Sequence, residues 1–148
     1  ALGAGGGSPA IPIKSLRPSL RLTMADAKAR KAAFLGEAVR VLGLRDAKVE
    51  HARFEELVLR AEFHHQFDVV TVRAVRADDR LFAAAHVLLN IHGGQGRLLM
   101  FQSGEEAAAQ SKQFRRVDTF RLLDQPRVYL VCLEPAPAPP AFHVEQSG

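Results

Sequence analysis

The chain begins with a glycine-rich run, ALGAGGGSPAIPI, that leads into a helix-forming segment. Gly3, Gly5 and Gly7 fall at alternate positions, so the backbone there can adopt positive φ and approach a ligand with no Cβ in the way. Ser8 is predicted to cap a helix whose first position is Pro9, where a missing N–H costs nothing. A glycine loop that leads into a helix N-terminus binds a phosphate or a carboxylate, so the run predicts a ligand-binding loop.

Downstream of this loop, short apolar runs alternate with stretches at helical spacing. This βαβα order predicts an α/β fold with a mainly parallel sheet and helices on both faces. The predicted strands span residues 20–25, 47–51, 67–72 and 96–102, a hairpin pairs 114–122 with 127–133, and the predicted helices span 27–42, 78–89 and 104–110. Asp78 is placed to cap the second of these helices.

The domain organisation follows from the proline content near the end of the chain. Residues 1–134 are expected to form one core domain, because 148 residues with 47% hydrophobic composition suffice for a single packed core. Residues 135–148 alternate proline with alanine at their start and are expected to form a tail that joins neither a sheet nor a helix.

A carboxylate helps to choose the ligand of the loop. Asp26 closes the strand after the loop, about 20 residues beyond Gly5, where a carboxylate in this topology accepts hydrogen bonds from both hydroxyls of an adenosine ribose. The dinucleotide pattern G-x-G-x-x-G fails because Ser8 occupies the third glycine position, and G-x-G-x-G matches better. Together these features predict S-adenosylmethionine. Taken singly, the loop is also explained as a flexible linker and Asp26 as a helix cap.

With these residues identified, the chain resembles the bacterial ribosomal RNA small subunit methyltransferase G family (glucose-inhibited division protein B), which methylates guanine N7 in 16S ribosomal RNA. The resemblance runs from residue 1 to about 133, and Ile11-Pro12 and Arg73-Ala74 are its most specific pairs. It is carried by the segments GAGGGSPAIPIKSLRPSL, LTMADAKARKAAFL and FDVVTVRAV. The resemblance implies a Rossmann-like class I S-adenosylmethionine-dependent methyltransferase.

The resemblance also implies roles for particular residues. Gly3 and Ser8 of the loop, and Asp26, fall at cofactor-contacting positions, and Gly5 and Gly7 belong to the same loop. Three further cofactor-contacting positions are Phe54, which would cover the adenine face, Glu55, which would accept from its polar edge, and Arg73. Arg73 would hold the methionine carboxylate or an RNA phosphate. Without the resemblance, Phe54 and Glu55 fit a short helical turn with one core aromatic, and Arg73 fits a solvated strand end.

The implied activity is that of an rRNA (guanine-N7-)-methyltransferase. Its partner would be 16S ribosomal RNA or the small ribosomal subunit in the cytoplasm, and the net charge of +4 is compatible with an anionic partner. N7 has a lone pair in the ring plane and no proton to lose, so transfer requires alignment of the reacting atoms and no catalytic base is assigned.

The chain departs from the family pattern in three places. Ala1 stands where the family carries Asp, and Gln102-Ser103 stand where it carries Lys-Gly. The family's N-terminal helices and most of its first strand have no counterpart, so we expect a truncated chain in which that strand's neighbours are unpaired and turnover is slow or absent. These departures favour, as an alternative, a non-catalytic cofactor- or RNA-binding relative. A nicotinamide-dependent oxidoreductase is a further alternative, which Ser8 opposes.

Other classes of site find little support in the sequence. No run approaches the roughly 18 apolar residues of a membrane span. The single cysteine, Cys132, cannot form an internal disulfide. The adjacent His64 and His65 would face opposite ways on a strand, so no metal site is expected.

Overall fold

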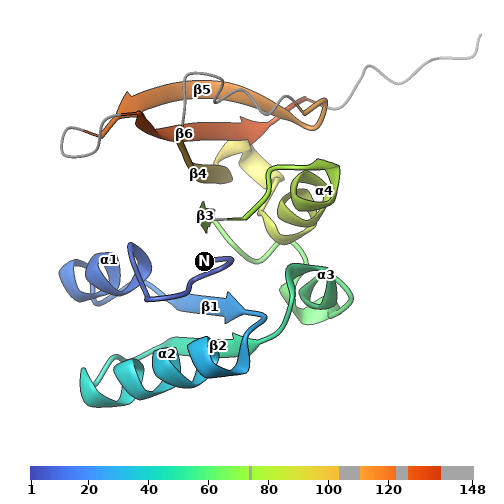
Figure 1. Ribbon diagram of the computed structural model, residues 1–148. Coiled ribbons are helices and arrows are strands. Elements are labelled where there is room, and N and C mark those ends of the chain that lie inside the picture. The colour runs from blue at the N-terminus through green and yellow to red at the C-terminus, as the bar shows by residue number, and fades with distance from the viewer. Residues whose placement is uncertain (74, 104–110, 123–126, 138–148) are drawn as a thin grey trace, which may run out of the picture.

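The computed structural model describes residues 1–73, 75–103, 111–122 and 127–137. Its helices are α1 (Ala10–Leu16), α2 (Ala29–Val41), α3 (Phe54–Leu57) and α4 (Asp79–Leu88), with 3₁₀ turns η1 (Ala61–Phe63) and η2 (His92–Gly94). Its strands are β1 (Leu22–Asp26), β2 (Ala47–His51), β3 (Val69–Arg73), β4 (Arg97–Ser103), β5 (Phe114–Arg121) and β6 (Val128–Pro135). Figure 1 shows the strands as one stack, with α1 on one side and α3 and α4 on the other.

Residues 1–4 join two groups of strands into this single stack. The first group is the parallel pair β1-β2, and the second has the order β3-β4-β6-β5. Leu2 pairs in parallel with both Ala25 of β1 and Val72 of β3, so the start of the chain lies between the two groups (Figure 1). The Leu2 N–H donates to Thr71 O at 2.8 Å, and the Ala25 N–H donates to Ala1 O at 2.9 Å. The backbone of residues 1–4 therefore serves as a short central strand.

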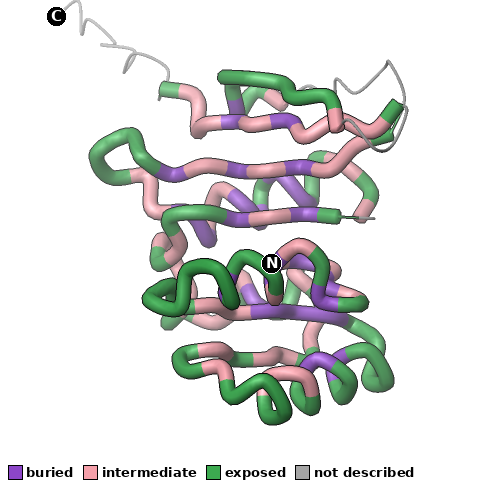
Figure 2. Tube along the Cα trace, turned by 90° about the vertical axis from the view of Figure 1, so that its left-hand side faces the viewer, coloured by how far each residue is buried: buried purple, intermediate pink, exposed green. Residues whose placement is uncertain are grey.

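The hydrophobic core is divided between the two faces of the sheet. On one face, α1 and α2 pack against β1 through Ala10, Leu35 and Met24. On the other face, α3 and α4 pack against the inner strands through a larger cluster that includes Leu57, Leu81, Phe82, Val72, Met100 and Val131. Met24 and the neighbouring Ala25 belong to different clusters because successive side chains of a strand point to opposite faces. Figure 2 shows buried positions along the inner strands.

The α/β arrangement predicted from the sequence is confirmed. β3 and β4 are parallel, whereas β6 runs antiparallel to β4 and pairs with β5 as the predicted hairpin. The remaining elements differ from their predicted bounds by one or two residues at most ends, as in α2, which begins at Ala29. Asp78 caps α4, because its Oδ1 accepts a hydrogen bond from the Leu81 N–H at 3.0 Å. The helix predicted at 104–110 lies outside the described residues.

Two expectations about the ends of the chain need correction. The neighbours of the first strand are not left wholly unpaired, since residues 1–4 hydrogen-bond to both β1 and β3. At the other end β6 continues through Pro135, which pairs with Phe114, so the predicted tail does not begin at residue 135. Proline is tolerated there because β4 pairs with β6 only as far as Leu133, which leaves one neighbouring strand at Pro135. Residues 138–148 lie outside the described ranges.

None of the helices in the described ranges combines the length and the apolar composition needed to cross a membrane.

The bridging role of residues 1–4 can be tested through the side chain of Leu2, which is 5% exposed within the larger core cluster. We expect Leu2→Ala to lower the free energy of unfolding by about 2–5 kcal/mol, because it leaves a cavity where the two groups of strands meet. Urea denaturation measures this change. As the matched control, Leu16→Ala changes a side chain that is 83% exposed and should stay within about 0.5 kcal/mol of the parent. Similar losses for the two variants would contradict the bridging role.

Candidate functional site

The glycine loop leaves the sheet at the carboxyl edge, between β1 and β3. Residues 1–4 have β1 on one side and β3 on the other, so the loop emerges where the strand order changes direction. In open α/β sheets this is the place where ligands bind. Gly3, Gly5 and Gly7 all have positive φ, at 63°, 47° and 84°. Their predicted conformation is therefore confirmed.

Asp26 fixes the shape of this loop. Its Oδ2 accepts the Gly5 N–H at 2.9 Å, and its Oδ1 accepts the Lys28 N–H at 2.9 Å. The carboxyl group is buried and makes no cap bond to α2, whose N-cap is Lys28, so the interpretation of Asp26 as a plain helix cap is wrong. An ionised carboxylate can accept about four hydrogen bonds, and only two are taken by the backbone. Asp26 thus keeps acceptor capacity for a pair of hydroxyl groups.

The start of α1 differs from the sequence prediction. Ser8 does not cap the helix; Pro9 is the N-cap residue, with no side-chain cap bond, and the Ser8–Pro9 peptide is cis. The Ile11 N–H donates to Gly7 O at 2.7 Å, while Pro9 and Pro12 carry no N–H. Of residues 9–12, at most Ala10 keeps an N–H for a ligand. The prediction of free N–H groups at this helix end is therefore wrong, and the unused hydrogen-bonding capacity beside the loop lies on Asp26.

Arg73 and Ser8 are brought together although 65 positions separate them in the chain. The Arg73 Nη1 group at the end of β3 donates to Ser8 Oγ at 3.2 Å, and its guanidinium carbon lies 5.9 Å from the centre of the Phe101 ring on β4. A Cβ on Gly3 would lie 3.1 Å from Arg73 O and 2.6 Å from Val75 Cγ2, so the loop packs closely against the end of β3. Arg73 is exposed, and its charge faces the loop side of the sheet edge.

Phe54 and Glu55 lie at the same edge, on the first turn of α3. The Ala52 N–H donates to Asp26 O at 3.1 Å and ties the start of this segment to the end of β1. Phe54 is half-buried and packs against the larger core cluster, which is the short helical turn with a core aromatic that the sequence also allowed. Glu55 is exposed. No hydrogen bond joins either side chain to the glycine loop among the described residues.

The structure adds residues that the sequence did not single out as part of this site. Lys31 Nζ on α2 lies 4.0 Å from the position that a Cβ on Gly5 would take, so a cation stands over the loop. The sequence could have indicated Lys31 only through its place near the start of the helix that follows Asp26. Gln102 Oε1, near the end of β4, is buried without a hydrogen-bond partner within the part of the chain that the structure describes.

Among the described residues, metal-binding side chains are not gathered at this edge. His64 Nε2 lies 2.6 Å from Val58 O, and His65 Nδ1 lies 2.8 Å from Leu89 O, so both histidines are engaged by backbone carbonyls. Across the described ranges, no three His, Cys, Asp or Glu side chains are close enough together to hold a metal ion.

Comparison with known protein families gives one match over most of the chain. Residues 1–129 match the family model of rRNA small subunit methyltransferase G. The protein of that name from Roseiflexus sp. (strain RS-1) is 40% identical over 92 residues, which are 62% of this chain and 39% of the relative. The protein from Roseiflexus castenholzii is 45% identical over 74 residues, 50% of this chain and 32% of the relative. The chain thus spans well under half the length of these curated relatives.

Solved structures of low sequence identity share the fold. N,N-8-amino-8-demethyl-D-riboflavin dimethyltransferase from Streptomyces davawensis superposes with a TM-score of 0.72 at 14% identity, covering 91% of this chain and 48% of that one. A variant of MtNAS in complex with S-adenosylmethionine superposes with a TM-score of 0.69 at 16% identity, covering 92% of this chain and 53% of that one. The Rossmann-like class I methyltransferase fold expected from the sequence is confirmed.

The structure changes what a substitution at Asp26 should do in the absence of ligand. The sequence alone predicts that Asp26→Asn lowers the affinity for the ligand and leaves the stability of the ligand-free protein unchanged. In the structure both carboxylate oxygens accept a backbone N–H, and the NH2 group of asparagine would replace one of these acceptors with a donor. One backbone N–H would then lose its partner, so we expect the unfolding free energy without ligand to fall by about 1–3 kcal/mol. Urea denaturation is the measurement. Asp68→Asn, at an exposed carboxylate, is the matched control and should be close to neutral, whereas a neutral Asp26→Asn would show that the two bonds do not hold the loop.

Proposed function

The chain belongs to the rRNA small subunit methyltransferase G family, and we propose that it transfers a methyl group from S-adenosylmethionine to guanine N7 in 16S ribosomal RNA. The match of residues 1–129 to the family model is the observation that carries this proposal. The partner would be the RNA itself or the small ribosomal subunit in the cytoplasm. Because the chain covers part of its relatives, these assignments rest on membership together with the site described above.

The site suits an adenosine-containing ligand better than a dinucleotide. Asp26 retains two acceptor positions at the edge where a ribose would lie, and Gly5 and Gly6 present backbone with no crowding atom closer than 3.7 Å to a Cβ. A dinucleotide pyrophosphate needs several N–H donors at a helix end, and residues 9–12 supply at most one. We therefore assign cofactor contacts to Gly3, Gly5, Gly7, Ser8 and Asp26.

The side chains around the loop divide the remaining tasks. Phe54 would cover one face of the adenine, and Glu55 would accept from its amino group. Arg73, held beside Ser8, would bind the methionine carboxylate or a phosphate of the RNA through its planar fork. Bound S-adenosylmethionine supplies an electrophilic methyl group, and guanine N7 releases no proton, so these residues align two reactants and none acts as a base.

The choice of cofactor can be tested by isothermal titration calorimetry. We expect measurable binding heat with S-adenosylmethionine and with its demethylated product, and none with NAD, because the two prolines and the engaged Ile11 N–H take away donors that a pyrophosphate requires. Asp26→Asn should weaken the two nucleoside ligands at least tenfold, through loss of charge-assisted bonds worth about 1.5–3 kcal/mol. Heat with NAD alone would overturn the cofactor assignment.

The site of methylation is the second test. The chain is incubated with labelled S-adenosylmethionine and small-subunit RNA, and mass spectrometry of the digested RNA locates the methyl group. We expect transfer to be slow, as the departures from the family pattern imply, and to yield 7-methylguanosine. Arg73→Ala should lower this transfer by roughly 10–100-fold, more than it lowers cofactor affinity if the guanidinium also holds the RNA. Binding of the cofactor without transfer would favour a non-catalytic relative, the alternative that Gln102 and Ala1 support. A methyl group on any other base atom would refute the specificity.

A further inference from the structure

The segment that carries Phe54 and Glu55 is tied to the sheet at both of its ends. At its start, the Ala52 N–H donates to Asp26 O at 3.1 Å. At its far end, Arg60 Nη1 donates to Glu50 Oε2 at 2.8 Å. Glu50 lies on β2 directly opposite Ala25, which precedes Asp26 on β1. Both ties therefore reach the end of the sheet where Asp26 is predicted to bind a ribose.

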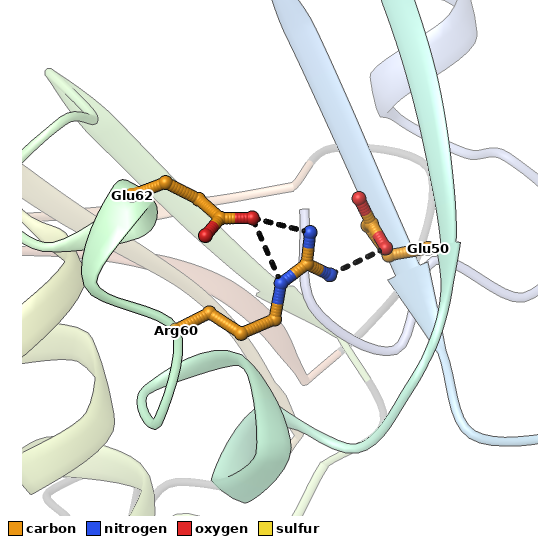
Figure 3. A network of polar contacts seen from close by, with 3 residues as sticks. All are labelled: Glu50, Arg60 and Glu62. Carbon is orange, nitrogen blue, oxygen red and sulfur yellow. Dashed lines mark hydrogen bonds and ion pairs between the residues drawn. The ribbon is translucent and has the colours of Figure 1, made fainter.

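Arg60 makes the second tie with its whole guanidinium group. Its Nε and Nη2 atoms lie 3.1 Å and 2.6 Å from Glu62 Oε1, while Nη1 faces Glu50 (Figure 3). The guanidinium carbon also lies 4.4 Å from the centre of the Phe63 ring. The hydrogen bonds from Arg60 lower the pKa of Glu62, because they stabilise the ionised form of this carboxylate. One cation therefore joins two carboxylates and an aromatic ring on two different elements.

Removal of this cation would affect the segment more than the fold. Without Arg60, the carboxylates of Glu50 and Glu62 would repel each other across the gap that Arg60 now fills. Leu57, 3% exposed, would still anchor α3 in the core. The expected result is a folded protein in which α3 stays held at its start by the Ala52 bond and in the core by Leu57, while its far end is released from β2 and the helix can tilt.

We propose that Arg60 is a positioning residue for the adenine end of the cofactor site. It holds the far end of the segment against β2, and together with the Ala52–Asp26 bond at the near end it sets the tilt of α3, which carries Phe54 and Glu55. Arg60 touches no ligand and acts through these two residues. This inference rests on the proposed function, because it requires an adenosine ligand at Asp26.

The test compares two ligands that differ only at the adenine amino group. S-adenosylhomocysteine carries this group, and its analogue with unsubstituted purine in place of adenine carries a hydrogen there, so that it has no N–H to donate to Glu55. We expect the parent protein to prefer the adenosine ligand, and Arg60→Met to reduce that preference by roughly fivefold, a typical size for coupling between neighbouring groups. Arg60→Lys should retain part of the preference, because it keeps one of the charged bonds.

The matched control is another arginine-glutamate pair. Arg40 bonds to Glu37 on the exposed face of α2, three residues apart and away from α3, so Arg40→Met should leave the preference unchanged. Glu50→Gln, which weakens the same tie from the β2 side, is a second variant with an independent effect on folding and should reproduce Arg60→Met. Thermal unfolding of each variant shows that the protein is folded during the titration.

The outcomes separate the two levels of the argument. Absence of binding by the parent protein would overturn the proposed function and this inference with it. Binding by the parent with no preference between the ligands, or an unchanged preference in both Arg60→Met and Glu50→Gln, would overturn the positioning role alone. An equal loss of affinity for both ligands would show that the tie supports the fold and does not place the adenine contacts.

Discussion

The arrangement of this protein depends on the backbone hydrogen bonds that residues 1–4 make on both of their sides. Leu2 bridges Ala25 and Val72, and without that bridge β1-β2 and β3-β4-β6-β5 would be separate sheets with exposed inner edges. The same bridge sets where the chain leaves the sheet. Because residues 1–4 are central and parallel to both neighbours, the glycine loop must emerge at the carboxyl edge, beside the ends of β1 and β3. The position of the candidate ligand site therefore follows from the way residues 1–4 join the two groups of strands.

Asp26 connects this architecture to the chemistry. Its carboxylate receives one N–H from the loop and one from the turn that leads to α2, so a single buried charge holds two connections in place. The energy of a charge-assisted bond in a buried environment is larger than that of an exposed pair, which explains why a short loop of glycines can have one shape. The positive φ angles are permitted by the glycines and selected by the carboxylate. Asp26 therefore holds the loop in its shape and also keeps the unused acceptor positions beside it.

Local patterns in the sequence were sufficient for the elements and for the family, but not for the contacts between elements. The spacing of apolar residues predicted α2, α4 and the hairpin, and Asp78 was correctly identified as a cap because capping involves residues three apart. Ser8 was assigned to the helix cap by the same local rule, and that assignment failed because α1 begins one residue later than predicted, with Pro9 as its N-cap. The Ser8 hydroxyl instead accepts a hydrogen bond from Arg73, which lies far along the chain. The pairing of Arg60 with Glu50 depends on the register of β2 and the length of the α3 segment, which no local pattern specifies. Phe54, Glu55 and Arg73 as ligand contacts remain predictions.

The two prolines at the start of α1 have an electrostatic consequence for the kind of molecule that can approach the loop. An ordinary helix start presents several N–H dipoles and concentrates positive potential, which attracts phosphates and repels cations. Here Pro9 and Pro12 have no N–H, and that of Ile11 is directed at Gly7, so the potential at this point is weak. A ligand whose reactive centre is a sulfonium cation would meet little repulsion there. The start of α1 therefore contributes little to the electrostatic potential at the loop. The charged groups beside the loop are the Asp26 carboxylate on one flank and the Arg73 and Lys31 cations on the others.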